Sequence, residues 1–246
     1  MFSSYLTIAF RNLRKRETSS WISIAGLAIA ISCCIFILLF IFDELQFDRF
    51  HVNGDRIYRG VYSNTRTGER AAIMAGVLFP KIMSAVPEFE SGCRLTRRTD
   101  QPIRIGQRLF TGDLFFADQE ILQMMSFPLE RGDPGTALKE PFTAVLTDSL
   151  AKRYFGQEEP IGRTFIIDDK YEFRVTGILR DIPKHSHIRP EFIASLNSYN
   201  TIDPRLLNDI RESGTYFYFL LRRNASPAAA EAKLQKVFES HHGEDT

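Results

Sequence analysis

The sequence lacks an excess of charge of either sign. Lys and Arg total 31 against 30 for Asp and Glu in 246 residues, a formal net charge of +1. Proteins that bind nucleic acids or acidic substrates usually present a basic excess. The balanced composition gives no electrostatic support for either, and we expect no nucleic-acid partner.

Cysteine is scarce, and the few cysteines are badly placed for a disulfide framework. Cys33 and Cys34 are neighbours inside an apolar run, and Cys93 stands alone. We therefore predict no structural disulfide. Fixed-period repeats and low-complexity tracts are also missing, which leaves a chain whose 44% hydrophobic content is ample for a packed core.

One long apolar run is present. Trp21 to Phe42 is 22 residues without a charge, about 33 Å as a helix, which is enough to cross a hydrocarbon core of about 30 Å. Four basic residues precede it and three acidic residues follow it: Arg11, Arg14, Lys15 and Arg16, then Asp43, Glu44 and Asp48. We predict a transmembrane helix over 21–42, with a cytoplasmic N-terminus and a remainder that lies outside the cytoplasm from about residue 43.

Three other interpretations of this run are weaker. A signal peptide cleaved after Ala28-Ile29-Ala30 would leave a long apolar remnant. Lipoprotein processing at Cys33 would need small residues where Ala30-Ile31-Ser32 stands. A buried soluble helix rarely needs so many uncharged residues.

The residues before the run form an amphipathic pattern. On a helix, Phe2, Tyr5, Leu6, Ala9, Phe10 and Leu13 share one face, and Arg11, Arg14 and Lys15 lie opposite. This favours a cytoplasmic interfacial helix over 1–20 that lies on the lipid bilayer. The simpler alternative is a basic patch that only sets the topology.

The rest of the chain has a mixed pattern, because no other apolar run is long enough to span. We predict strands over 56–64, 89–98, 103–105, 142–146, 164–167, 171–179 and 216–221, and helices over 75–85, 148–155 and 227–238, the last with Ser226 as its N-cap. Irregular mixing of helices and hairpins favours an α+β fold. The expected domain covers 43–240, in two subdomains, with a polar tail over 241–246.

The stretch AKRYFGQEEPIGRTF (Ala151 to Phe165) resembles a phosphate-binding loop only superficially. Five residues, two of them Glu158 and Glu159, separate its glycines, Arg163 replaces the lysine, and the stretch follows a helix instead of preceding one. We interpret Gly156 as a left-handed helix C-cap, and Pro160 and Gly162 as the turn into a strand.

Other possible chemical motifs lack their context. Ser149 and Lys152 match the S-x-x-K pattern of serine acyl-enzymes, but the downstream K-T-G is missing and Arg66-Thr67-Gly68 lies upstream. His185 and His187 could share a strand face, but metal sites need three or four ligands. His241 and His242 fit a solvated tail. We assign no catalytic, cofactor-binding or metal-binding residue.

Specific strings resemble a known family. AFRNLRKR (Ala9 to Arg16), DELQFDRFH (Asp43 to His51) and DRIYR (Asp55 to Arg59) are similar to the start of MacB/FtsX-type ABC transporter permeases, especially the Bacteroidetes branch. The similarity continues through GDPGTALKEPFTAVLTDSLAKRYFGQEEPIGRTF (Gly132 to Phe165) and VTGILRDIPKHSHIRPEF (Val175 to Phe192).

The resemblance implies a non-catalytic permease subunit of the inner (cytoplasmic) membrane, with a MacB-like periplasmic core domain from about residue 43. It implies a cytoplasmic ABC ATPase that hydrolyses ATP, a dimer with another permease subunit, and room for a periplasmic partner. Such systems export or extract lipoproteins, peptides, antibiotics or toxins, or regulate cell-wall hydrolases. Family permeases continue with at least three more membrane helices, so the sequence is expected to be a truncated or N-terminal part.

Two other classes of protein remain open from the residues alone. A signal-anchored periplasmic sensor or adaptor would share the single span, but only about twenty residues lie before it to serve as an output module. An envelope-anchored hydrolase is disfavoured because the acyl-enzyme and metal patterns lack their partners.

Overall fold

The computed structural model describes residues 17–45, 50–63, 70–183 and 186–242. The chain divides into two compact units, 1–47 and 48–246. The first contains helix α2 (Glu17–Leu45), which includes the predicted range 21–42 and extends beyond both of its ends. Within it, Trp21–Glu44 is long and apolar enough to cross a membrane. Most of the predicted interfacial helix lies outside the described residues.

The second unit is built on one mixed sheet of ten strands, which confirms the α+β expectation. The strands are β1 (Ile57–Arg59), β4 (Ile73–Ala75), β5 (Phe89–Ile105), β6 (Arg108–Ala117), β7 (Leu129–Arg131), β8 (Thr143–Thr147), β9 (Thr164–Ile167), β10 (Tyr171–Leu179), β11 (Phe192–Ser195) and β12 (Ser213–Leu221). Their order is β1-β12-β5-β6-β11-β8-β10-β7, with β4 added on β12 and β9 paired to both β10 and β5. The pairs β10–β8 and β11–β6 are parallel.

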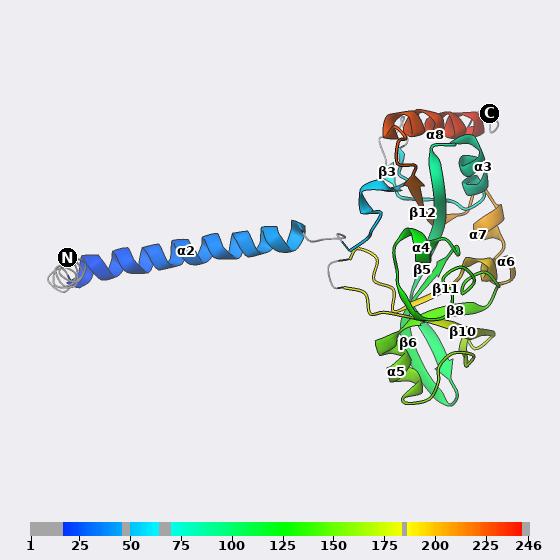
Figure 1. Cartoon of the computed structure of the whole chain (residues 1–246), viewed down its shortest axis with the longest axis horizontal. Coiled ribbons are helices and arrows are strands. Elements are labelled where there is room, and N and C mark those ends of the chain that lie inside the picture. The colour runs from blue at the N-terminus through cyan, green and yellow to red at the C-terminus, as the bar shows by residue number, and fades with distance from the viewer. Residues whose placement is uncertain (1–16, 46–49, 64–69, 184–185, 243–246) are drawn as a thin grey trace. The chain divides into compact units, whose positions relative to one another are not determined.

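Helices cover this sheet at several places (Figure 1). They are α3 (Leu78–Ala85), α4 (Ile121–Met124), α5 (Asp148–Phe155), α6 (Tyr199–Ile202), α7 (Arg205–Asn208) and α8 (Pro227–His242), with 3-10 turns at Gly54–Arg56 and Leu196–Ser198. A separate ribbon pairs β2 (Tyr62–Ser63) with β3 (Arg70–Ala71).

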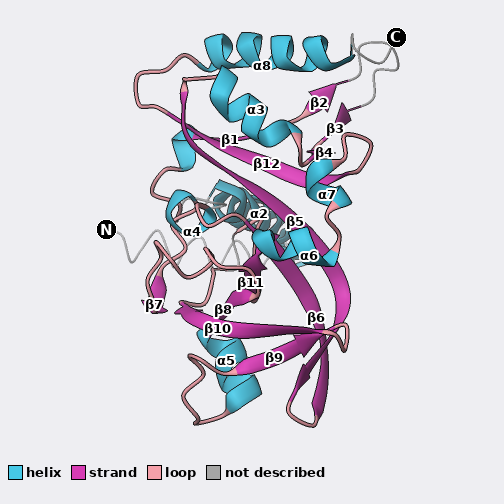
Figure 2. Cartoon of the chain, turned by 90° about the vertical axis from the view of Figure 1, so that its right-hand side faces the viewer, coloured by secondary structure: helices cyan, strands magenta, loops and turns pink. Residues whose placement is uncertain are grey.

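The long strand β5 runs from one end of this unit to the other (Figure 2). Helices α3 and α8 lie at one end, and α5 with β9 lies at the other. Phe89 of β5 belongs to a hydrophobic cluster with α3 and α8, which we call the α8 core. Cys93 and Leu95 belong to a cluster around α4, the α4 core, and Ile103 belongs to a cluster around α5, the α5 core. One strand therefore joins all three cores.

Strand β12 is buried on both faces. Phe217 and Phe219 belong to the α8 core, while Tyr218 and Leu220 between them belong to the α4 core. A strand covered on both faces needs no polar alternation. This explains why Tyr216 to Leu221 reads as a continuous apolar run.

The predicted break between strands 89–98 and 103–105 is a bulge instead. β5 is continuous, but its register with β6 shifts between Arg98 and Gln101. Asp100 has a φ of 54° there, a value that Asp tolerates better than most residues. The turn signals in the sequence therefore mark a bulge, which bends a strand without ending it.

Other elements follow the local signals closely. The Thr147 hydroxyl oxygen accepts from Leu150 N at the start of α5, and Gly156, with a φ of 65° and a ψ of −120°, ends that helix. Its φ is positive as predicted, although its ψ is not that of a left-handed helix. The strands predicted over 164–167 and 171–179 are β9 and β10, and they pair as a hairpin with positive φ at Asp168 and Asp169 in its turn.

Some boundaries were predicted wrongly. The helix expected from Ala75 begins at Leu78, because Ile73–Ala75 pairs with β12. The strand expected over 56–64 is split into β1 and β2. Helix α8 continues to His242, past the expected end near Phe238, so the two histidines first placed in a polar tail lie on its last turn.

Candidate functional site

The first described residues after α2 are fixed to the turn that follows α4. The ring Nδ1 of His51 lies 2.5 Å from the carbonyl oxygen of Met125, and Val52 N donates to Ser126 Oγ at 3.1 Å. A carbonyl can only accept, so Nδ1 carries the proton. The ring of Phe50 lies 6.4 Å from that of Phe127, centroid to centroid. We call Phe50–Val52 with Met125–Phe127 the anchor.

The turn that receives these residues is itself held firmly. Phe127 N donates to the Leu122 carbonyl oxygen at 2.9 Å, and Ser126 adopts a φ of 51°. The Phe127 side chain is 2% exposed in the α4 core, and His51 is 7% exposed. Residues 50–52 are thus attached to a packed part of the domain.

An ion pair connects the same region to β5. The Asp118 carboxylate accepts from Arg94 N at 2.8 Å, and from Arg94 Nε and Nη2 at 2.9 Å each. The two side chains are only 16% and 12% exposed. The Arg94 guanidinium also lies 5.4 Å from the ring centroid of Phe79. Because Asp118 precedes α4, contacts run without a gap from the anchor to β5.

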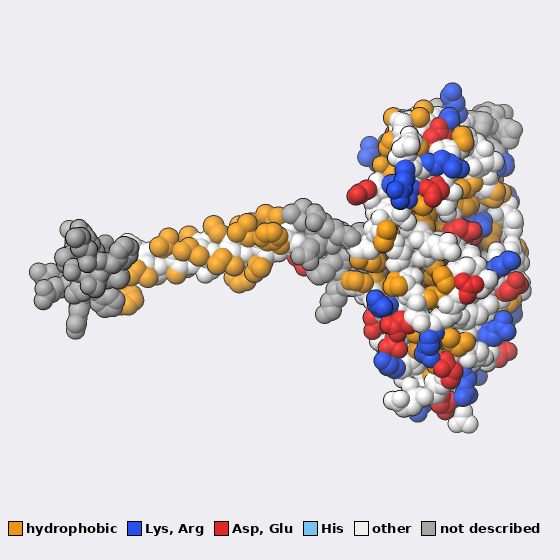
Figure 3. Space-filling model, in the orientation of Figure 1, with side chains coloured by type: hydrophobic (Ala, Val, Ile, Leu, Met, Phe, Trp, Pro, Cys, Tyr) orange, Lys and Arg blue, Asp and Glu red, His pale blue; other side chains and the backbone are white. Residues whose placement is uncertain are grey.

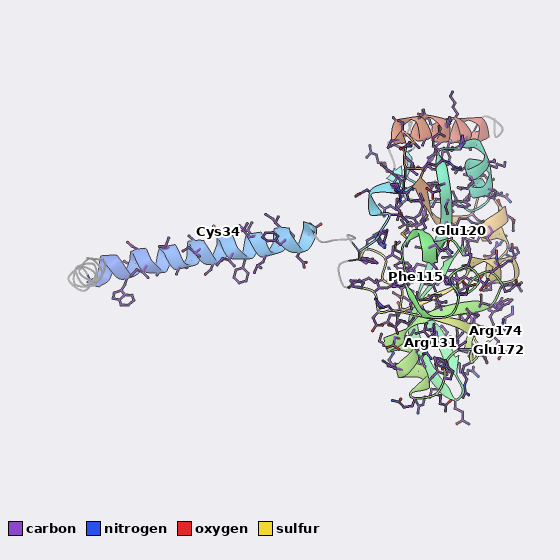
Figure 4. The ribbon with its side chains drawn as sticks, viewed as in Figure 1. Cys34, Phe115, Glu120, Arg131, Glu172 and Arg174 are labelled. Carbon is purple, nitrogen blue, oxygen red and sulfur yellow. The ribbon has the colours of Figure 1, made fainter. Side chains whose placement is uncertain are left out.

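A polar groove of about 610 Å³ lies between the start of α5, strand β6 and residues 181–182 and 187–191. Arg97 in its wall pairs with Asp113 at 2.5 Å and lies 5.5 Å from the ring centroid of Phe115, which Figure 4 labels within the domain. The hydrogen bond from Arg97 lowers the pKa of the Asp113 carboxyl below its usual value.

Two residues singled out in the sequence line this groove together. Ser149 and His187 both contribute to its wall, as does Asp181. Asp181 Oδ1 accepts from Ser149 N at 3.1 Å, and the His187 Nε2 lies 3.4 Å from the Tyr218 hydroxyl. Lys152 pairs with Asp148 at 2.6 Å. The N-cap of α5 is Thr147, two residues before Ser149.

The remaining candidates can be placed only in part. His185 and Arg66-Thr67-Gly68 lie outside the described residues. Among the residues that the structure describes, no group of three or more His, Cys, Asp or Glu side chains is placed to hold a metal ion.

The loop that resembled a phosphate site connects α5 to β9, as interpreted. Its two acids are paired: Glu158 with Arg163 at 2.8 Å, and Glu159 with Arg131 at 2.8 Å. Figure 4 labels Arg131. Gly162 adopts a φ of 85° just before the strand begins. The glycines and charges of this loop form a turn braced by ion pairs.

The anchor was not foreseen from the sequence. Asp43 to His51 was singled out only as part of a family resemblance, and Asp118 and Arg94 were not singled out at all. One signal was available: Phe50 stands in a charged stretch of the sequence, and Phe is among the residues that are most often fully buried.

The family comparison now gives a clear result. Residues 20–237 match the model of the MacB-like periplasmic core domain, so this chain belongs to that family and the resemblance seen in the sequence is confirmed. No protein with curated annotation matches the chain significantly.

Solved structures share the fold. One is a domain of a predicted permease from Porphyromonas gingivalis, with a TM-score of 0.66 and 20% identity over 78% of this chain and 86% of that one. The periplasmic region of MacB from Actinobacillus actinomycetemcomitans gives 0.55 and 19%, over 76% and 83%. The extracellular domain of the noncanonical ABC-type transporter YknZ from Gram-positive bacteria gives 0.56 and 11%, over 76% and 95%.

Proposed function

We propose that this protein is a non-catalytic permease subunit of an ABC transporter in the inner membrane. A partner ATPase in the cytoplasm hydrolyses ATP, and the domain from about residue 43 changes position or shape in the periplasm. This movement drives export or extraction of a substrate. Family membership supports this role, together with one helix apolar enough to span a membrane.

The charge flanks of the span support the orientation. Basic residues gather before Trp21, and acidic residues follow Phe42, which favours a cytoplasmic N-terminus. A phosphatase that is active only in the periplasm, fused after Thr246, should be active. Activity of a cytoplasm-only reporter at that site would contradict the orientation.

The observation that carries the proposal is the anchor. A mechanical subunit needs a firm connection between its membrane segment and the domain that moves. Here His51 and Val52 are hydrogen-bonded to the turn after α4, and Arg94 and Asp118 connect that region to β5. Discrete, well-packed contacts of this kind would carry a displacement that reaches Phe50 onward into the sheet.

The test begins with the partner. The tagged chain is purified from native membranes, and the ATP hydrolysis that accompanies it is measured. Hydrogen exchange in 118–127 is then compared with and without ATP plus vanadate. We expect an ATP-dependent change at this segment, because it receives the chain from the span.

Two variants make the test specific. The double variant Phe50→Ala, His51→Ala should keep the ATPase bound but lose the nucleotide-dependent change. Arg104→Ala, which removes an exposed pair with Asp169 far from the anchor, should behave like the unmodified chain. If no ATPase accompanies the chain, or if exchange ignores ATP, the proposal is wrong.

A further inference from the structure

Exposed apolar side chains are concentrated just after the span. Outside α2, seven large hydrophobic side chains in the described part of the chain are well exposed, and three of them are Val52, Tyr58 and Val61. Val52 is 87% exposed, more than Phe36 at 72% within the span itself. Single exposed apolar residues need no explanation, but this concentration in ten residues does.

The anchor explains why Val52 faces outward. Phe50 and His51 pack against Phe127, and the backbone of Val52 is tied to Ser126. With its amide bonded to Ser126 Oγ, Val52 leaves its side chain 87% exposed. Its neighbour His51 is buried and Phe50 is partly buried, so Val52 is the residue of the three that meets whatever surrounds the domain.

Chain length limits what that surrounding can be. Val52 is seven positions after Leu45, the last residue of α2, so the two Cα atoms are at most about 25 Å apart. The span over Trp21–Glu44 brings its C-terminal end to the headgroup layer, where Tyr side chains are enriched. The surface of the domain is otherwise mixed, with charged side chains distributed among hydrophobic ones, whereas α2 is hydrophobic along its described length (Figure 3).

We propose that Val52, Tyr58 and Val61 form a collar that contacts the headgroup and upper acyl region of the outer leaflet. Valine would bury its methyl groups there, and Tyr58 would keep its hydroxyl among the headgroups. The collar would set the height of the domain above the membrane. This requires that α2 crosses the bilayer with the domain on the outer side, but it requires no transport activity, so it can be right or wrong independently of transport.

The single tryptophan of the chain makes a direct test feasible. In the full chain with Trp21→Phe, we would introduce Val52→Trp or Val61→Trp and reconstitute each in phosphatidylcholine vesicles. Lipids brominated near the headgroup end of their acyl chains quench tryptophan on contact. Leu109→Trp is the matched control, since Leu109 is also well exposed, at 66%. It lies at the start of β6, next to the C-terminal end of β5, which is the end of that strand away from α3 and α8 (Figure 2).

The proposal predicts clear quenching and blue-shifted emission for Val52→Trp and Val61→Trp, and neither for Leu109→Trp. Quenching of the two collar variants no stronger than that of the control would overturn it. Blue-shifted but unquenched emission would also overturn it, because a second copy or a protein partner would then cover the collar. The two collar variants check each other, since both sites are exposed and tolerate a large side chain.

Discussion

Replacing Asp118 by Asn should destabilise the domain more than any comparable change at an exposed pair. The Asp118 carboxylate accepts three hydrogen bonds from Arg94, and the two side chains are 12% and 16% exposed. Breaking a fully buried pair costs about 3–5 kcal/mol, because one charge remains without its partner. The expected cost here is about 2–4 kcal/mol, because both side chains keep some solvent exposure and the carboxamide oxygen of Asn can still accept one hydrogen bond from Arg94.

The assay is urea unfolding of the full chain in detergent micelles, followed by near-ultraviolet circular dichroism of the domain. Asp169→Asn is the matched control, since its pair with Arg104 is 61% and 43% exposed; it should cost less than about 0.5 kcal/mol. A double variant Arg94→Met, Asp118→Asn should cost less than the sum of the single changes, because no charge is left unpaired. Equal costs at Asp118 and Asp169 would refute the reasoning.

Three further outcomes follow from local geometry. Gly132→Ala should lower the free energy of unfolding by about 3 kcal/mol or more, because φ is 96° and the new Cβ would lie 2.6 Å from the Thr176 carbonyl oxygen. Gly106→Ala, where φ is 56° but the space is open, should lower it by only about 1 kcal/mol. Thermal melting of the two variants checks this difference. Burial raises the pKa of the Cys93 thiol, so with the span cysteines replaced, maleimide should label it only as the domain unfolds, and fast labelling of the folded protein would contradict this. Burial raises the pKa of Tyr218 to about 12, so the stabilisation from its neutral side chain should be complete below pH 10 and be lost as pH rises from 10 to 12. In melts over that pH range, Tyr218→Phe should lose less stability than the unmodified protein.

Local structure was predictable where local chemistry decides it. The α5 helix follows from Thr147 as N-cap and Gly156 as C-cap, and both residues serve there. The hairpin of β9 and β10 follows from period-two alternation around Asp168 and Asp169, which both adopt positive φ. In each case the signal and its physical cause lie within about ten residues.

Structure that depends on distant partners was missed. Strand β6 and strand β11 were not predicted, and they pair in parallel with Ile193 opposite Phe115. The contact of His51 with the Met125 carbonyl spans 74 positions. The periodicity of a single segment does not show which distant segment it pairs with, because the pairing depends on the side chains of both segments.

The groove lined by Ser149 and His187 also shows that local patterns can identify residues without showing which of them come together. Ser149 and His187 were considered separately, each within a motif that lacked its partners, and the fold brings them into one wall. The Ser149 backbone N donates to Asp181, the Ser149 hydroxyl lies 3.4 Å from that of Thr147, and the His187 ring lies beside the Tyr218 hydroxyl; neither motif includes these neighbours. Local patterns therefore identified two residues of this wall, although not the surroundings that determine their roles.

The arrangement of β5 decides how the domain would respond to a displacement at the anchor. Its bulge between Arg98 and Gln101 is the natural place for bending, since register is lost there. However, the partly buried side chains of Arg98 and Asp168 pair at 2.8 Å and tie the strand to the β9 turn beside the bulge, whereas the pair of Arg97 with Asp113 on β6 is exposed and adds little. With the three cores joined by one braced strand, movement at Arg94 would shift both ends of the domain together. Under the proposed function, the domain would thus act as one lever and not as two hinged halves.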